Sequence, residues 1–363
     1  MGEWQGIRLG DFAPFKYGKA LPERNRRPGD VPVYGSNGVV GSHDTPLIDR
    51  SMVVIGRKGS IGEVHFSPQG GWPIDTTFYV TSGQGRDIRF TYYLLRTLGM
   101  QYMSSDSAVP GLNREAAHNL VVQIPPLSEQ RAIAEVLGAL DDKIEANRKN
   151  ELHAHELIGA LFKRLMMQQS HTEVRLIEAV QFVYGEPFNS SYFNSERLGR
   201  PLIRIRDLKT FAPQTYTTEE RDRETIVAPG SVVVGMDAEF RPTIWCGEPG
   251  LLNQRVSLAL PLVGSPSFTY MLLREPLAHV ESFKTGTTVS HLNKTDLEQI
   301  RVTIPESAAL CQFDSMAEPL REMIVASHQE NRALADLRDA LLPELMSGEL
   351  RVREAERLVE DAV

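Results

Sequence analysis

Residues 124–131 read IPPLSEQR. The run that follows them, from Ala132 to about Met167, contains no proline. Ser128 and Glu129 suit the first turn of a helix, where a hydroxyl caps free backbone N–H groups and a carboxylate faces the positive end of the helix dipole. The two prolines before them cannot continue an ordinary strand or helix, so they mark a boundary. We therefore expect a helix that starts here with Ser128 as its N-cap.

The run also carries a repeat in which positions alternate at steps of four and three. It passes through Ile133, Leu137, Leu140, Ile144, Asn147, Glu151, Ala154, Ile158, Leu161 and Leu165. This spacing is typical of a helix that packs lengthwise on another helix. At about 1.5 Å per residue the helix would be roughly 60 Å long. A compact domain rarely needs such a rod, so its length indicates a spacer.

Composition places the chain among ordinary globular proteins. Its 363 residues suggest two or three domains, with 41% hydrophobic and 24% charged residues. No apolar run approaches the roughly 20 residues of a membrane span, and the first residues lack a signal-peptide pattern. Cys246 and Cys311 are the only cysteines, too few for a disulfide framework. We expect a reducing cytoplasm as the location and no resident metal or cofactor.

The net charge of −8 is unevenly distributed. Residues 1–123 carry a net charge of +2, residues 124–170 of −1, residues 171–304 of −2 and residues 305–363 of −7. The acidity therefore lies mostly at the C-terminal end, and the parts that look globular are nearly neutral. This balance permits a nucleic-acid-binding face there without requiring one.

The second half of the chain repeats the first at an offset of about 180 residues. Residues 53–56 (VVIG) match 232–235 (VVVG), 112–114 (LNR) match 292–294 (LNK), and 120–125 (LVVQIP) match 300–305 (IRVTIP); Tyr17-Gly18 matches Tyr184-Gly185 at a shorter offset. Short apolar runs predict strands at 31–34, 52–55, 77–80, 202–205, 231–234 and 256–260. Helical patterns cover 88–102 and 268–283. The pattern indicates a duplicated unit in which a globular part precedes a long helix.

The second long helix is expected from Ser307, its predicted cap, to Gly348. Pro319 and Pro343 should kink or segment it because proline removes a backbone donor. In both long helices the apolar heptad positions are replaced by polar residues near the middle. These are Asn147 and Glu151 in the first helix and Ser327 and Asn331 in the second. Either the packing is imperfect there, or these groups pair and set the register. Residues 350–352 could then form a short returning strand.

Several of these motifs resemble the specificity subunit of type I restriction–modification systems. They are residues 124–131, LDDKI at 140–144, LLPELMSG at 341–348, GRKGSIG at 56–62 and the two Leu-Asn-Arg/Lys turns. The resemblance covers almost the whole chain. It implies an α+β fold with two pseudo-repeated α/β target recognition domains, separated by two long helices packed as an antiparallel coiled coil. The implied parts are recognition domain 1 (1–123), spacer helix 1 (124–170), recognition domain 2 (171–304), spacer helix 2 (305–350) and a C-terminal tail (351–363).

The resemblance also implies a function. Each recognition domain would read one half of a bipartite, asymmetric target in double-stranded DNA, and the helices would dock two modification subunits. Those partners would bind S-adenosylmethionine and methylate adenine, and a restriction and translocase subunit would join for cleavage. The chain itself would have no catalytic site, and its sequence contains no methyltransferase, dinucleotide or Walker motif. The alternative is a coiled-coil DNA-binding or assembly protein of another phage-defence complex without a modification partner.

Candidate DNA-binding residues lie in loops at strand ends. In the first half they are Tyr34, Ser36, Asn37, Arg57, Lys58 and Ser60. Arg57 suits a guanine edge or a phosphate, Lys58 a phosphate and Asn37 an adenine edge. The alternative is that the neighbouring glycines simply form turns and the charges are solvated.

The second half departs from the first in the matching loop, where 57–60 (RKGS) is replaced by 236–241 (MDAEFR). Acidic groups repel phosphate but accept a hydrogen bond from the amino group of cytosine. The candidates here are Asp237, Glu239, Arg241, Arg204, Arg206, Lys209, Lys284 and Lys294. Asp237 and Glu239 are predicted base readers supported by Arg241. Backbone contact or solvated charge is predicted for Arg204, Arg206 and Lys209, and Lys284 and Lys294 belong to a small polar turn.

Overall fold

The computed structural model describes residues 4–103, 111–167, 170–284 and 291–360. The chain divides into two compact units. Unit 1 comprises Met1–Lys143 and Leu334–Val363, and unit 2 comprises Ile144–Ala333. Each unit therefore contains one globular part and a portion of both long helices. Within the described part of the chain, none of the helices has the length and apolar character needed to cross a membrane.

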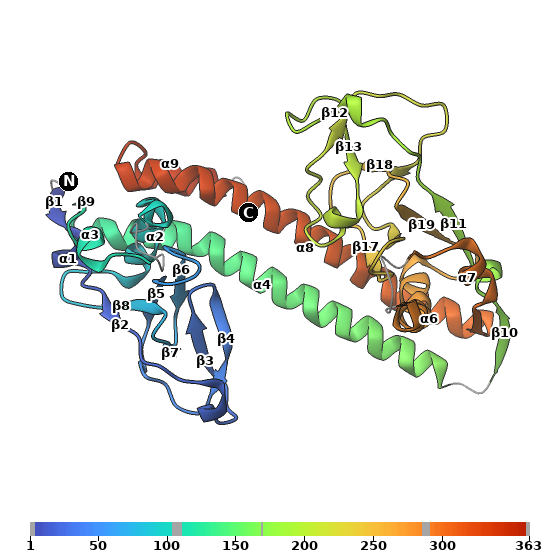
Figure 1. Cartoon of the computed structure of the whole chain (residues 1–363), viewed down its shortest axis with the longest axis horizontal. Helices are drawn as coiled ribbons and strands as arrows, with labels where there is room; N and C mark the ends of the chain where they lie inside the picture. The colour runs from blue at the N-terminus through green and yellow to red at the C-terminus, as the bar shows by residue number, and fades with distance from the viewer. Residues whose placement is uncertain (1–3, 104–110, 168–169, 285–290, 361–363) are drawn as a thin grey trace. The chain divides into compact units, whose positions relative to one another are not determined.

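Unit 1 is built on two small sheets (Figure 1). An antiparallel sheet has the strand order β2-β8-β5-β6, and a second sheet has the order β4-β3-β7, in which β3 and β7 are parallel. The bounds are β2 (Lys16–Tyr17), β3 (Val31–Gly35), β4 (Gly38–His43), β5 (Met52–Gly56), β6 (Val64–Ser67), β7 (Trp72–Pro73) and β8 (Thr77–Thr81). The strands predicted at 31–34, 52–55 and 77–80 are confirmed. Strand β5 is central and buried along its whole length, which explains its unbroken apolar run.

Unit 2 repeats the first of these sheets with the same topology, in the order β11-β19-β16-β17. Its second sheet has five strands in the order β12-β14-β13-β18-β15, with β13 and β18 parallel as β3 and β7 are. The bounds are β11 (Val180–Tyr184), β12 (Phe193–Asn194), β13 (Arg200–Ile203), β14 (Tyr216–Thr217), β15 (Ile226–Val227), β16 (Val232–Gly235), β17 (Pro242–Ile244), β18 (Gly250–Leu252) and β19 (Val256–Pro261). The duplication is thus confirmed, with added strands in unit 2.

A short antiparallel pair closes each globular part just before a long helix begins. Strands β1 (Gln5–Arg8) and β9 (Val121–Ile124) pair in unit 1, and β10 (His171–Arg175) and β20 (Arg301–Pro305) pair in unit 2. The short helices of unit 1 are α1 (Leu9–Phe12), α2 (Ile88–Thr97) and α3 (Arg114–His118), and those of unit 2 are α5 (Leu176–Ala179), α6 (Pro266–Lys284) and α7 (Lys294–Gln299). Single 3₁₀ turns span Glu23–Asn25, Met100–Tyr102, Ser190–Tyr192 and Ile205–Leu208. The helix predicted at 88–102 ends earlier because Gly99 adopts a left-handed conformation, with φ of 61°.

The long helices are α4 (Leu127–Met166) and α8 (Ser307–Ser347). The predicted caps were wrong, since each helix begins before or at the expected residue. The Pro126 carbonyl accepts the N–H groups of Glu129 and Gln130, and the Glu306 carbonyl accepts that of Leu310. Ser128 and Ser307 are therefore helical residues, and the preceding residue occupies the cap position.

The predicted segmentation of the second helix was also wrong, because α8 is one helix that contains both Pro319 and Pro343. Burial of its apolar residues on either side of Pro319 holds the segment helical: Ala317 is fully buried and Ile324 is 2% exposed. The strand predicted at 350–352 is absent, and helix α9 (Val352–Glu360) follows instead. The Glu354 carboxylate accepts the Arg351 N–H, which supports the start of that helix.

The two long helices pack antiparallel, as predicted. In unit 2 Asn147 contacts Glu330, and Phe162, further along α4, contacts Phe313, which comes earlier on α8. The buried side chains of α4 include most of the predicted repeat: Ile133, Leu137, Leu140, Ile144, Asn147, Ala154, Ile158 and Leu165. The polar positions do pair. Asn331 donates to Glu151 at 3.3 Å, whereas Asn147 donates to Glu330 at 2.7 Å rather than pairing with Ser327.

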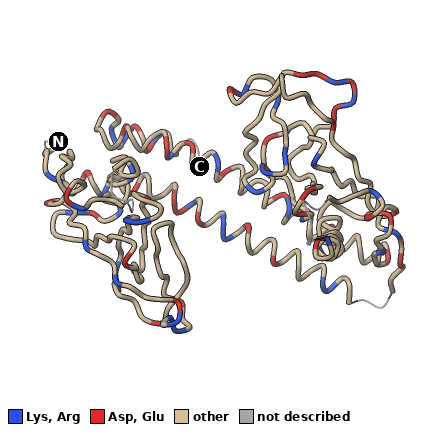
Figure 2. The backbone as a smooth tube through the Cα atoms, viewed as in Figure 1, with Lys and Arg blue, Asp and Glu red and all other residues tan. Residues whose placement is uncertain are grey.

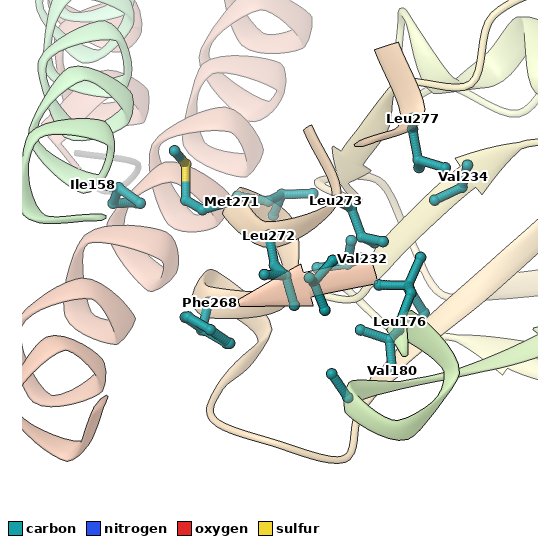
Figure 3. Close-up of a cluster of buried hydrophobic side chains, with 14 of the residues drawn as sticks. Ile158, Leu176, Val180, Val232, Val234, Phe268, Met271, Leu272, Leu273 and Leu277 are labelled. Atoms are coloured by element: carbon teal, nitrogen blue, oxygen red, sulfur yellow. The ribbon is translucent and has the colours of Figure 1, made fainter. Parts of the chain in front are cut away.

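The main core of unit 2 lies where its antiparallel sheet meets helix α6. Figure 3 shows Met271, Leu272 and Leu277 of α6 with Val232 and Val234 of β16. Ile158 of α4 and Phe268 also belong to this cluster, and both are fully buried. The core therefore joins the sheet, α6 and the long helices of unit 2 into one packed body, which holds the loops at the strand ends in place.

Candidate nucleic-acid interface

The loop after β5 in unit 1, residues 57–62, is held by backbone hydrogen bonds to two other segments. The N–H groups of Arg57 and Lys58 both donate to the Thr76 carbonyl, at 2.9 and 3.1 Å. The Arg57 carbonyl accepts the N–H of Leu112 at 2.9 Å, and Lys58 forms a β-bridge with Gly111. These contacts bring the loop, the 74–77 turn and the Leu-Asn-Arg turn together. The loop is fixed by its main chain, so its side chains are free to vary.

Glycine is required at two positions of this loop. A Cβ on Gly56 would lie 2.0 Å from the Ser60 carbonyl, because the chain folds back over the end of the strand. Gly59 has a φ of 81°, a left-handed conformation that favours glycine, and open space around it. The tip therefore projects away from the body of unit 1, with Lys58 and Ser60 exposed on either side of Gly59.

Two arginines of this region lie close to one exposed tyrosine. The guanidinium carbon of Arg57 is 5.1 Å from the ring centroid of Tyr17, and that of Arg114 is 4.9 Å from it. Tyr17 is 50% exposed and packs against Phe78, with the ring centroids 5.0 Å apart. The sequence prediction included Arg57 but neither Tyr17 nor Arg114. The repeated Tyr-Gly and Leu-Asn-Arg/Lys motifs were the signal that pointed to both segments.

Two predicted contact residues of unit 1 are buried, which corrects the sequence reading. Tyr34 is 7% exposed and packs with Met52 and Val54, so its ring belongs to the core. Ser36 is also 7% exposed, and its hydroxyl lies within hydrogen-bonding distance of the Lys58 and Thr76 carbonyls. Neither side chain is available to a base. Asn37, at the turn between β3 and β4, is exposed and remains a candidate.

The matching loop of unit 2 has the same main-chain frame. The Met236 N–H donates to the Arg255 carbonyl at 2.9 Å, the Met236 carbonyl accepts the N–H of Leu292 at 2.8 Å, and Asp237 forms a β-bridge with His291. Ala238 has a φ of 62° in the place of Gly59. A residue with a Cβ is strained there, so the surrounding hydrogen bonds must hold the turn.

The charges of this second loop differ from those of the first. Asp237 lies where unit 1 has Lys58, and its carboxylate is 2.5 Å from His291 Nδ1 and 3.5 Å from Arg255 Nη1. Glu239 pairs with Lys209 at 2.9 Å, and this pair lowers the pKa of the Glu239 carboxyl. The predicted residues Asp237, Glu239 and Lys209 are thus brought together, and His291 and Arg255 join them. Arg241 is exposed next to this loop.

The remaining predicted cations of unit 2 are engaged with its own groups. Arg206 donates to the Thr215 hydroxyl at 2.7 Å, and the main chain of Arg204 is bonded to Asp207. Lys284 contacts Asp296 at 2.5 Å, and Lys294 contacts Glu298 at 3.7 Å. Exposed pairs of this kind are weak, so they do not prevent contact with phosphate, but they reduce its gain. Lys and Arg are interspersed with Asp and Glu in both units rather than gathered in one basic stripe (Figure 2).

Helix α2 of unit 1 is fixed to both long helices by charged and polar contacts. Arg89 forms a two-point pair with Asp142 and donates to the Gly138 carbonyl. The Tyr93 hydroxyl donates to Asp141 at 2.6 Å, and Arg338 of α8 donates to the same carboxylate at 2.7 Å. Burial raises the pKa of Tyr93, so its hydroxyl stays protonated. The Asp141-Asp142 motif therefore attaches the recognition part of unit 1 to its helices.

Comparisons with known proteins agree with this architecture. Residues 1–154 match the family model described as the type I restriction modification DNA specificity domain. The specificity subunit of the type I restriction enzyme EcoBI from Escherichia coli is 33% identical over 146 residues, which are 40% of this chain and 31% of that protein. The MjaIX specificity subunit from Methanocaldococcus jannaschii is 26% identical over 307 residues, covering 73% of this chain and 69% of that protein.

Among solved structures, the type I restriction–modification S subunit from M. genitalium has a TM-score of 0.68 at 16% sequence identity, covering 94% of this chain and 96% of that one. That likeness shows the fold. Two related sheet units with two antiparallel long helices define an α+β fold. This chain is therefore similar, most clearly over its first 154 residues, to specificity subunits of type I restriction–modification systems.

Proposed function

We propose that this chain is the DNA sequence-specificity subunit of a type I restriction–modification enzyme. One recognition domain in each unit reads one half of a bipartite, asymmetric target, and the long helices dock two modification subunits. The matched span is 31% of the length of the E. coli relative, so the complete activity is our inference. The proposal is supported by the loops after β5 and β16, which have equivalent main-chain hydrogen bonds and β-bridges but different side chains. Two different half-sequences need such a pair.

The chain contributes recognition and no chemistry in this proposal. S-adenosylmethionine binds to the modification subunits, which methylate adenine at N6, and a restriction and translocase subunit joins when DNA is cut. The DNA contacts of unit 1 come from Arg57, Lys58, Ser60 and Asn37. In unit 2 they come from the loop that contains Asp237, Glu239 and Arg241, with support from His291 and Arg255. Direct readout requires donors and acceptors held at a base edge, which the fixed main chains of these loops provide.

The test is an exchange of recognition domains. Residues 1–123 are replaced by the corresponding domain of a related specificity subunit, and the hybrid is produced with its modification subunit. Genome-wide mapping of methyladenine should then show a target in which one half has changed and the other half is retained. A reciprocal exchange of residues 171–304 is the matched control and should change the opposite half. An unchanged target in the first hybrid, or methylation by the isolated chain, would refute the proposal.

A further inference from the structure

We propose that Tyr17, Arg57 and Arg114 form a binding site for a DNA backbone phosphate in unit 1, and that unit 2 has no equivalent site. This inference rests on the proposed function, because it assigns one part of the recognition surface to sequence-independent contact. It also adds two residues, Tyr17 and Arg114, that the sequence had not indicated as DNA ligands.

The three residues come from separate segments that the fold brings together. Tyr17 ends strand β2, Arg57 follows β5, and Arg114 begins α3. Each guanidinium carbon is about 5 Å from the same ring centroid, within the range of a cation–π contact. The Leu112 N–H bond to the Arg57 carbonyl ties the segment before Arg114 to the loop after β5. The two cations are thus held in place before any ligand arrives, which reduces the entropy lost on binding.

The two guanidinium groups are no more than about 10 Å apart, because each lies about 5 Å from one centroid. Like charges at that separation repel each other, and an anion close to both groups is attracted by both. Within the described residues, the carboxylate paired with them is that of Glu115, 3.3 Å from Arg114 and 72% exposed. Such an exposed pair is worth little. The cations therefore keep most of their attraction for phosphate.

Donor groups also remain available for phosphate oxygens. Arg57 Nη1 donates to the Asp75 carbonyl at 3.1 Å, which uses one of its N–H groups. Arg114 Nη2 donates to the Glu115 carboxylate at 3.3 Å, and Arg114 Nε is buried, so a phosphate would bind this guanidinium through its Nη groups. A planar guanidinium presents its N–H groups as a fork that matches phosphate geometry. Lys58 is exposed on the adjoining loop and adds a third positive charge.

Unit 2 keeps the tyrosine but has only one of the two matching cations. Tyr184 ends β11 as Tyr17 ends β2, but Met236 stands in the place of Arg57. Lys294, which matches Arg114, pairs with Glu298 at 3.7 Å. Burial, with a smaller contribution from the Glu298 carboxylate, raises the pKa of Tyr184. A phosphate here would meet one lysine in place of two guanidinium groups, so this position attracts an anion less strongly than its counterpart in unit 1.

The experiment measures DNA affinity of the full chain assembled with its modification subunits. A fluorescent duplex of about 30 base pairs without the target sequence is titrated at several salt concentrations between about 50 and about 200 mM. The double variant Arg57→Ala/Arg114→Ala should lower the magnitude of the salt slope by about one and weaken binding about tenfold at low salt. The control Arg353→Ala/Arg357→Ala removes the same two charges from exposed positions on α9 and should change neither value.

A second variant separates loss of charge from loss of fold. Arg114→Lys keeps the charge and should keep the wild-type slope, while Arg114→Ala should not. DNA binding by the double variant with an unchanged slope would overturn the phosphate site and leave the proposed function intact. Failure of the wild-type chain to assemble or to bind DNA would instead count against the proposed function.

The site's chemistry would also accept free inorganic phosphate, so a further arm distinguishes the two sources. At constant ionic strength, inorganic phosphate is titrated into the DNA-free complex, and its binding is measured by calorimetry. Inorganic phosphate alone should bind no more tightly to the wild type than to the double variant, because a backbone phosphate is held there together with the rest of the duplex. Phosphate binding that the double variant loses, together with an unchanged DNA salt slope in that variant, would overturn the assignment to DNA.

Discussion

The loops that follow β5 in unit 1 and β16 in unit 2 have the same main-chain frame and opposite charges. In both, the residue after the strand is hydrogen bonded to the same two neighbouring segments, and the next residue forms a β-bridge. Lys58 occupies that position in unit 1 and Asp237 in unit 2. Because hydrogen bonds of the backbone fix the loop, substitution of its side chains costs little stability. The main-chain hydrogen bonds are equivalent in both loops, whereas the charges of the side chains differ.

The attachments of the two globular parts to their long helices differ as well. In unit 1 the attachment is a charged carboxylate: Asp141 accepts hydrogen bonds from the Tyr93 hydroxyl and from the Arg338 guanidinium. In unit 2 the α6 segment is held by the apolar core and by Glu318, which accepts the Ser267 N–H at 2.9 Å and pairs with Arg321. The duplicated fold therefore constrains backbone topology more strongly than the side chains that secure it.

The largest expected difference concerns these attachments. Arg338→Ala leaves the carboxylate of Asp141, 22% exposed, without its cation and should lower the stability of unit 1 by about 3 kcal/mol. In unit 2, where the apolar core also holds α6, Glu318→Gln removes the charge that pairs with Arg321, keeps an acceptor for the Ser267 N–H and should cost about 1 kcal/mol. Native-state hydrogen exchange resolves the two units. Equal losses, or a comparable loss in the exposed variant Arg353→Ala, would contradict the proposed difference.

A smaller effect is expected when the first loop is given the charge of the second. Lys58→Asp removes a cation and adds an anion where phosphate is expected, so non-specific DNA affinity should fall about tenfold at low salt. The reciprocal change, Asp237→Lys, should leave affinity the same or raise it slightly. Fluorescence anisotropy at two salt concentrations measures both. If the two substitutions weaken binding equally, the loops do not differ in the way that their charges suggest.

The smallest effect on affinity is expected from Asp237→Asn. This change keeps the size of the side chain and removes the charge that contacts His291 and Arg255. The salt slope should stay constant, because no phosphate contact is lost, while discrimination between related target sequences should fall by about 1 kcal/mol. Competition of target and altered duplexes for the assembled complex measures this quantity. A changed slope with unchanged discrimination would assign Asp237 to backbone contact instead.

The candidate site was predictable from the sequence only in part. Arg57, Lys58 and Asp237 were identified because they lie in glycine-rich or repeated motifs at strand ends, and the structure places them in exposed or partly exposed loops. Tyr34 and Ser36 lie in a similar motif, yet both are buried. Alternation along a short strand does not reveal which face the neighbouring sheet covers, so their burial could not be derived locally.

The sequence by itself determined the two long helices, the duplication and most of the strands, because periodicity and repeated motifs are local properties of the chain. The helix ends and the continuity of α8 through its prolines were decided by tertiary packing, which outweighs the preferences of single residues. The same holds for the site. Tyr17, Arg57 and Arg114 are far apart in sequence, and only folding of β2, β5 and α3 against one another places two guanidinium groups beside one ring.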